Sequence, residues 1–213
     1  MLLDFDGPVC AAFTTITDSR IADALRQYMG EHGHPPPAAL RDTTEPLDVL
    51  AYTTGVSAEL ATAVEAELTR WECHAVRYAD PTPHVRDVLV WLADSARSVT
   101  VVSNNATSSI EKYLHSVELE AMVSGISART PENMSRLKPD PHLLQEAIAA
   151  HGATPDRYVM IGDSSSDIEA AHASGTASIG YANKPGAAER LSSYQPTALI
   201  HDMIELLTTD TIQ

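Results

Sequence analysis

The sequence lacks any apolar run long enough to span a bilayer, which excludes a membrane-spanning helix. It also lacks the basic start of a secretory signal: acids follow Met1–Leu3 at once, so we expect no such signal. It holds only two cysteines, Cys10 and Cys73, in no metal-binding or redox pattern, and isolated cysteines are usually small buried apolar residues. These absences fit a reducing, cytoplasmic compartment.

Basic residues are scarce as well. The chain has 14 lysines and arginines against 29 acids, a formal net charge of −15. Such a surface repels nucleic acid and anionic membranes, which argues against both as partners. Any anionic substrate must therefore meet a local positive centre, either a metal ion or a placed lysine.

Glycine-rich nucleotide loops are missing too. No G-x-G-x-x-G occurs, so a dinucleotide site is not expected. The stretch GYANKPG at 180–186 contains Lys184 but lacks P-loop spacing, and we interpret it as a loop after a strand. Internal repeats and low-complexity tracts are also absent.

What is present is an alternation of amphipathic helices and short apolar strands, typical of a parallel sheet covered on both faces. The chain of 213 residues is long enough for one sizeable core, or for a core plus a small accessory domain. The predicted fold is α/β, a Rossmann-like parallel sheet core with helices on both faces and an inserted α-helical domain. Strands are expected at 1–6, 98–103, 121–127, 157–162 and 176–181, and helices at 17–29, 57–76, 84–95, 108–117, 141–152 and 165–175, with the apolar segments 197–200 and 202–207 closing the chain.

The helical insert follows the first strand. Apolar residues recur at four-residue steps in 17–29 behind a predicted cap at Asp18 or Ser19, and again in 57–76 behind Ser57. The segment 32–55 contains four prolines and must be partly loop. A second proline-rich break at 79–84 reads as a linker. We therefore predict a core domain of residues 1–10 and 82–213, and a helical domain of residues 11–81.

Unusual polar residues follow the strands. The first strand ends in DFDG, the second in SNN and a later one in GDSSSD, while LKPDP lies in a loop before a helix. Open α/β sheets bind ligands at the carboxyl ends of their strands. The four stretches are therefore expected to converge on one crevice.

Two acid pairs lie among these stretches. Asp4 and Asp6 project from the same face of a strand, and Asp163 and Asp167 share one side of a helix start. Each pair alone has a plain alternative, a solvated turn for the first and a helix N-cap at Asp163 for the second. Together they indicate a hard-cation site, because close carboxylates repel unless a cation lies between them. Oxygen ligands favour Mg²⁺, whereas zinc would require histidine or cysteine.

Two other residues suit an anion. Ser103 ends a strand and is either a helix cap or an anion ligand. Lys138, one of three lysines, would ordinarily be a surface side chain, but Pro139 holds its backbone extended and aims it. The chemistry requires such a cation, because a phosphate near Asp4 meets repulsion of roughly 4 kcal/mol per unit charge pair at 4 Å and an effective dielectric near 20.

In this order, DFDGPV, VVSNN, LKPDP and IGDSSSDIEAA resemble the four motifs of the haloacid dehalogenase-like (HAD) hydrolase superfamily. The helical insert resembles the small cap of its phosphoglycolate-phosphatase-like branch. Pro8 stands where the family more often has Thr or Val, which bears on the loop after the first motif. The resemblance covers essentially the whole chain and implies a phosphatase.

The resemblance also implies residue roles. Asp4 would be the nucleophile that forms an aspartyl-phosphate, and Asp6 would protonate the leaving oxygen and then activate water. Ser103, Asn104 and Lys138 would hold the phosphoryl oxygens. The implied cofactor is Mg²⁺, with Asp6 contributing its backbone carbonyl. The implied metal set is Asp4, Asp6, Asp163 and Asp167.

Alternatives remain open at this stage. Asp6 argues against carbon–halogen cleavage, because a halide leaves without protonation. A sugar phosphomutase of the β-phosphoglucomutase type is the enzymatic alternative, and a catalytically silent phosphate-binding protein is the alternative of another class. The predicted partner is a small phosphorylated metabolite, with no nucleic acid and no membrane, and the predicted state is monomer or homodimer.

Some residues stay outside the predicted site. His32 and His34 could bind a metal, but a surface loop is the better interpretation. In the insert, Phe13, Arg41 and Tyr52 are conceivable contacts with the rest of the substrate, although packed aromatics and a solvated arginine are the more ordinary roles.

Overall fold

A single parallel sheet of six strands forms the centre of the core, in the order β3-β2-β1-β4-β5-β6. The computed structural model describes residues 1–207, so positions 208–213 of the predicted core range lie outside the described residues. The α/β fold predicted from the sequence is confirmed. The strands are β1 (Leu2–Leu3), β2 (Thr100–Ala106), β3 (Gly125–Arg129), β4 (Val159–Gly162), β5 (Ala177–Tyr181) and β6 (Ala198–Ile200).

Strand β1 is the shortest yet lies at the centre, paired with β2 on one side and β4 on the other. Leu2 and Leu3 are fully buried. The predicted strand 1–6 is too long, although Asp4 extends the ladder by one bond, donating its N–H to the Ile161 carbonyl at 2.9 Å. Two buried leucines thus anchor the chain directly before the first acid.

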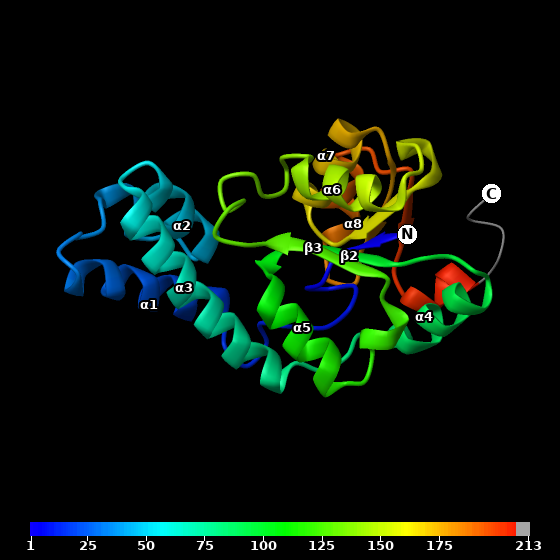
Figure 1. The fold of residues 1–213 in the computed structure, drawn as a ribbon, viewed down its shortest axis with the longest axis horizontal. Helices are drawn as coiled ribbons and strands as arrows, with labels where there is room; N and C mark the ends of the chain where they lie inside the picture. The colour runs from blue at the N-terminus through cyan, green and yellow to red at the C-terminus, as the bar shows by residue number, and fades with distance from the viewer. Residues whose placement is uncertain (208–213) are drawn as a thin grey trace.

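Helices cover both faces of the sheet (Figure 1). On one face lie α4 and α5 with the 3₁₀ turn η5, and on the other α6, α7 and α8. Among residues 1–207, no helix is both long and apolar enough to cross a membrane. The helix bounds are α4 Val85–Asp94, α5 Thr107–Ser116, α6 His142–His151, α7 Ser165–Ser174, α8 Ala187–Ser192 and η5 Met203–Leu207.

Two further strand boundaries differ from the prediction, and one helix was not predicted. β2 does not stop before the asparagines but continues to Ala106. β3 begins at Gly125, because Glu120–Met122 before it form a 3₁₀ turn (η3). Helix α8 was not predicted, since its six residues are too few to show a period.

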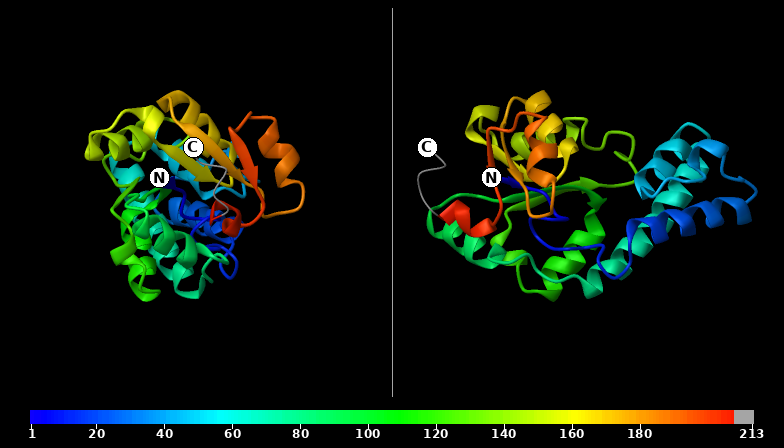
Figure 2. Two further views of the ribbon diagram at one scale, coloured as in Figure 1. Left: turned by 90° about the vertical axis from the view of Figure 1, so that its right-hand side faces the viewer. Right: turned by 180° about the vertical axis from the view of Figure 1, so that it is seen from behind.

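The inserted segment forms a group of helices beside the sheet (Figures 1 and 2). α1 (Asp18–Glu31), α2 (Pro46–Thr54) and α3 (Ala58–Ala75) pack around their own apolar cluster. Figure 2 shows the chain leaving the core before α1 and returning along α3. The boundaries 11–81 remain a prediction, and we use "cap" for this segment below.

Helix ends in the cap follow capping chemistry. Ser57 caps α3 as predicted, accepting a bond from the Leu60 N–H at 3.1 Å. The cap of α1 is Thr17, so the prediction of Asp18 or Ser19 is wrong by one or two positions. Pro46 opens α2 inside the segment expected to be partly loop, where a missing N–H costs a helix nothing.

Candidate active site

Three carboxylates meet at the carboxyl edge of the sheet. Asp4 follows β1, Asp163 follows β4 and Asp167 lies in the first turn of α7. One oxygen from each lies within 4.8 Å of the others. The cap of α7 is Ser164, whose hydroxyl and N–H both bond Asp167 Oδ2, so Asp163 is not used as the helix cap.

Lys138 holds two of these acids together. Its Nζ donates to Asp4 Oδ1 at 2.8 Å, to Asp167 Oδ1 at 2.6 Å and to the Val102 carbonyl at 2.9 Å. Burial alone would lower the pKa of Lys138, but the carboxylates of Asp167 and Asp4 outweigh it and raise the pKa. The ammonium therefore stays charged at the centre of the cluster.

The two acids of the first motif differ in environment. Burial, then the charge of Asp167, raises the pKa of Asp4 to about 8, against the opposing effect of Lys138. Burial also raises the pKa of Asp6 to about 6, while the Ala12 N–H, donating to Asp6 Oδ1 at 2.8 Å, lowers it. A pKa of about 6 leaves Asp6 able both to give and to take a proton near neutral pH.

Ser103 and Asn104 lie at the end of β2 beside the lysine. Asn104 exchanges two hydrogen bonds with the backbone of Lys138, donating to its carbonyl at 2.9 Å and accepting from its N–H at 2.8 Å. Ser103 is buried, with its hydroxyl bonded to Asn105. Ser103 thus lies at the cavity lining, and Asn104 fixes the loop that carries Lys138.

The donor set fits a hard cation. Asp4, Asp163 and Asp167 supply only oxygen, and no histidine or cysteine joins their group within residues 1–207. These are the ligand atoms that Mg²⁺ prefers. The Asp6 side chain is not part of the group, so its predicted metal contact through the backbone carbonyl stays a prediction.

Lys184 is a neighbour that sequence reasoning missed. Its Nζ lies 3.0 Å from Asp163 Oδ2, and the nearby Arg190 donates to the Asp163 carbonyl at 3.1 Å. The stretch that holds Lys184 is a loop after β5, as expected. Its position in the sequence could have identified it, because Lys184 follows a parallel strand whose carboxyl end lies at the same edge of the sheet as the acids.

Glycines leave room for two of the acids. A Cβ on Gly7, which has φ +104°, would lie 2.6 Å from Asp163 Cγ, and one on Gly162 would lie 2.2 Å from Asp167 Cγ. Pro8 fits the turn without loss, because the N–H groups of Val9 and Cys10 close it on the Phe5 carbonyl.

A second buried ion cluster joins cap and core, and its members were not predicted. Arg129 of β3 donates to both oxygens of Glu72 on α3, at 2.9 and 2.8 Å, and to Glu65 at 3.3 Å. It also donates to the Asn104 carbonyl at 2.7 Å. The cluster thus ties the cap helix to the strand end next to Lys138.

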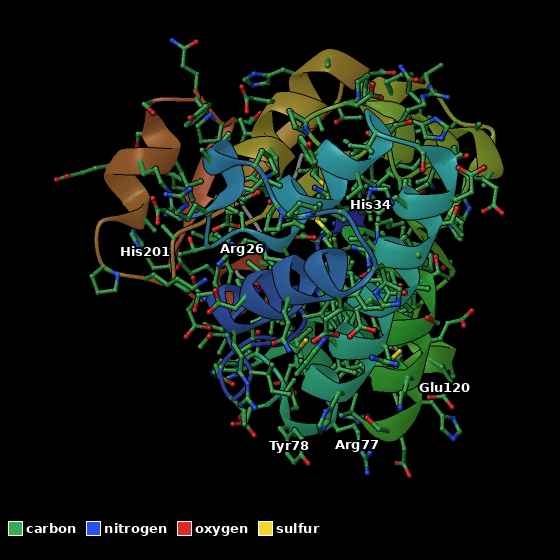
Figure 3. All side chains as sticks on the ribbon, turned by 90° about the vertical axis from the view of Figure 1, so that its left-hand side faces the viewer. Arg26, His34, Arg77, Tyr78, Glu120 and His201 are labelled. Atoms are coloured by element: carbon green, nitrogen blue, oxygen red, sulfur yellow. The ribbon has the colours of Figure 1, made fainter. Side chains whose placement is uncertain are left out.

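A cavity of about 200 Å³ opens between these acids and the cap. Of the conceivable cap contacts, Phe13 lines it, whereas Arg41 and Tyr52 are exposed and do not. His32 and His34 lie in an exposed loop as interpreted, and Figure 3 shows His34 on the cap end of the molecule. The predicted site residues Asp4, Asp6, Ser103, Asn104, Lys138 and Asp163 line the same cavity, and Asp167 lies behind it.

Comparisons with known proteins agree with this arrangement. A family model described as haloacid dehalogenase-like hydrolase matches residues 1–181. A phosphoglycolate phosphatase of Salmonella paratyphi A is 29% identical over 125 residues, which cover 59% of this chain and 49% of that protein. The match thus spans about half the length of such phosphatases.

Other relatives cover more of the chain. A pyrophosphatase PpaX of Oceanobacillus iheyensis is 27% identical over 158 residues, 69% of this chain and 70% of that protein. A solved haloacid dehalogenase-like family protein from Streptococcus pneumoniae superposes with a TM-score of 0.68 at 21% identity, covering 97% of this chain and 95% of that one. At this identity the likeness shows the fold alone.

Proposed function

We propose that this chain, which belongs to the haloacid dehalogenase-like hydrolase family, is a Mg²⁺-dependent phosphatase that hydrolyses a small phosphomonoester through an aspartyl-phosphate on Asp4. The observation that carries the proposal is the bridge of Lys138 between Asp4 and Asp167, beside a third carboxylate at the edge of the sheet. A buried lysine among carboxylates that lines a cavity suits an incoming phosphate dianion. The names of the relatives, phosphoglycolate phosphatase and pyrophosphatase, support phosphoryl hydrolysis as the reaction class.

In the first step, a carboxylate oxygen of Asp4 attacks phosphorus. The bond from phosphorus to the alcohol oxygen breaks, and protonated Asp6 gives its proton to that oxygen. Lys138 and Ser103 hold the equatorial phosphoryl oxygens. The raised pKa of Asp6, about 6, keeps a protonated fraction available near neutral pH.

In the second step, Asp6 takes a proton from water, and the water oxygen attacks phosphorus. The bond from phosphorus to Asp4 breaks, which releases inorganic phosphate and restores the Asp4 carboxylate and the protonated form of Asp6. When bound, Mg²⁺ would be held by Asp4, Asp163 and Asp167 and would neutralise phosphate charge. Asp163 and Asp167 thereby serve charge neutralisation rather than proton transfer.

Compartment and partner belong to the same proposal. The free thiols of Cys10 and Cys73 support a reducing, cytoplasmic setting. The partner would be a small phosphorylated metabolite handled by a monomer or homodimer. The phosphomutase alternative is less well supported, because a second phosphate would meet acids on the cap side of the cavity.

Turnover of p-nitrophenyl phosphate tests the proposal. We expect Mg²⁺-dependent release of nitrophenol, abolished by EDTA and restored by added Mg²⁺. The Asp4→Asn variant should lose at least about 10³-fold in kcat, because it removes the nucleophile. Equal activity in EDTA, or in the variant, would show that the mechanism is wrong.

A further inference from the structure

The cap side of the cavity carries negative charge and no positive charge. Asp18 at the start of α1, Glu45 before α2 and Glu72 on α3 line it, together with apolar Phe13 and Leu47. Among residues 1–207, the cap contributes no lysine, arginine or histidine to this lining. This is the wall that would face the alcohol part of a phosphomonoester whose phosphate lies on Lys138.

The cations near the cavity are already engaged. Lys138 bridges two acids of the core, Lys184 pairs with Asp163, and Arg129 is bound to Glu72 and Glu65. Within the described part of the chain, neither Asp18 nor Glu45 forms an ion pair. Two carboxylates of the cap, the half-buried Asp18 and the exposed Glu45, therefore line the cavity without an ion-pair partner.

The helix dipoles at these two positions do not offset the negative charge of the acids. Both acids lie at the start of a helix, where the helix dipole favours a carboxylate. Yet the pKa of Asp18 is raised to about 7, by burial first and then by the charges of Asp6, Glu45 and Glu72. The potential in this part of the cavity is negative despite the helix ends.

We infer, on the basis of the proposed function, that the substrate is the phosphate ester of a small amino alcohol, whose protonated amine lies between Asp18 and Glu45. A carboxylate or a second phosphate at that position would be repelled by both acids, while a neutral hydroxyl would gain no charge attraction from them. An ammonium group has three N–H donors, enough to bond both carboxylates.

The size of the cavity sets the scale of the substrate. The cavity volume of about 200 Å³ is that of a small-molecule site. A phosphate and an alcohol of a few heavy atoms fill such a space.

Three probes of nearly equal length test the inference by charge alone. 2-Aminoethyl phosphate is cationic in its alcohol part, ethyl phosphate is neutral and phosphoglycolate is anionic. We expect kcat/KM for 2-aminoethyl phosphate to exceed that for phosphoglycolate by at least about tenfold, with ethyl phosphate between them. The Asp18→Asn and Glu45→Gln variants should each lower that ratio, and the double variant should lower it to within about threefold of one.

A control variant separates recognition from a structural role. Asp42→Asn removes the same charge from an exposed cap position that does not line the cavity, and it should leave the ratio unchanged. If all three variants lose thermal stability alike while the ratio stays constant, Asp18 and Glu45 have only a structural role and the inference is wrong.

Failure of the inference is distinguishable from failure of the proposed function. If p-nitrophenyl phosphate is hydrolysed but phosphoglycolate or ethyl phosphate is preferred to 2-aminoethyl phosphate, the phosphatase proposal stands and the substrate inference is overturned. If p-nitrophenyl phosphate and all three probes are inert with Mg²⁺ present, the proposed function is overturned together with the inference that rests on it.

Discussion

The chain carries two buried clusters of mixed charge, and they differ in how fully their carboxylates are bonded. Around Arg129, each oxygen of Glu72 accepts two hydrogen bonds: Oε1 from Arg129 and Asn105, and Oε2 from Arg129 and the Ala106 N–H. A buried charge so completely bonded has little capacity left for a ligand. We refer to Arg129, Glu65 and Glu72 as the clamp.

Two of the three acids in the cluster with Lys138, Asp4 and Asp163, are bonded far less completely, whereas Asp167 accepts bonds from Lys138 and Ser164. Within residues 1–207, the Asp4 side chain accepts a bond only from Lys138, and the Asp163 side chain only from Lys184. Carboxylate oxygens left open beside one another favour a cation or a substrate. The comparison teaches that saturation, rather than burial or charge alone, separates a structural cluster from a reactive one.

The largest expected effect is on turnover, from a change in the cluster around Lys138. Asp163→Asn should lower kcat for p-nitrophenyl phosphate by about 10²- to 10³-fold, because it removes a carboxylate placed to hold the metal. The unfolding temperature of the metal-free protein should stay the same or rise, since burial raises the pKa of Asp163 and so disfavours its charged form.

Kinetics and calorimetry on purified protein measure both quantities. Asp156→Asn, at an exposed acid of the turn before β4, is the matched control and should change neither. If the Asp163→Asn variant keeps its turnover but unfolds at a much lower temperature, Asp163 has a structural role like that of the clamp.

A change in the clamp should lower stability far more than turnover. Arg129→Met leaves Glu65 and Glu72 buried without their cation, which costs about 3–5 kcal/mol of unfolding free energy. For a chain of this size the unfolding temperature should fall by about 10 °C. Turnover per folded molecule should fall by less than about tenfold, because Arg129 lies outside the substrate cavity.

Two further variants sharpen this expectation. Arg70→Met removes an exposed arginine of α3 that pairs with Glu67, and it should change the unfolding free energy by less than about 1 kcal/mol. Adding Glu65→Gln and Glu72→Gln to Arg129→Met should restore part of the lost stability. If Arg129→Met abolished turnover but not stability, the distinction between the clusters would be lost.

The smallest effect concerns pH. The pKa of Asp18 is about 7 in the folded chain against 3.8 as its ordinary value, so folding favours the protonated form. Its contribution to stability is therefore complete below about pH 3.8 and is lost as the pH rises through 7. The Asp18→Asn variant has no carboxyl group to ionise at this position, so it should not lose this stability as the pH rises.

Melting curves at intervals from pH 4 to pH 8 measure the difference. The unfolding temperature of Asp18→Asn minus that of the natural sequence should rise with pH over this range. For Asp42→Asn, at an exposed position, the same difference should stay flat. A flat difference for both variants would show that Asp18 is solvated like any surface acid.

Much of the fold and the site follows from the sequence, because local patterns specify them. Strand-end acids converge in any parallel α/β sheet, which is why Asp4 and Asp163 could be paired from positions far apart in the chain. Ser57 was identified as a cap from its place before an apolar period. Motif order placed Ser103 and Lys138 beside them.

The remainder depends on tertiary contacts that leave no local pattern. Arg129 and Glu72 lie 57 positions apart and meet only when α3 returns past the end of β3. Lys184 acquires its role only when β5 lies next to β4. Asp18 was taken for a cap because threonine, serine and aspartate occur in a row, and only backbone geometry identifies Thr17.

Gly7 and Gly162 have a consequence for sequence variation. Neither carries a functional group, yet a methyl group at either position would occupy the place of a carboxylate, at 2.6 Å from Asp163 Cγ or 2.2 Å from Asp167 Cγ. Substitution of these glycines is therefore coupled to Asp163 and Asp167 rather than to the fold around them. In any library built on this scaffold, the two positions belong with the acids among those to be held constant.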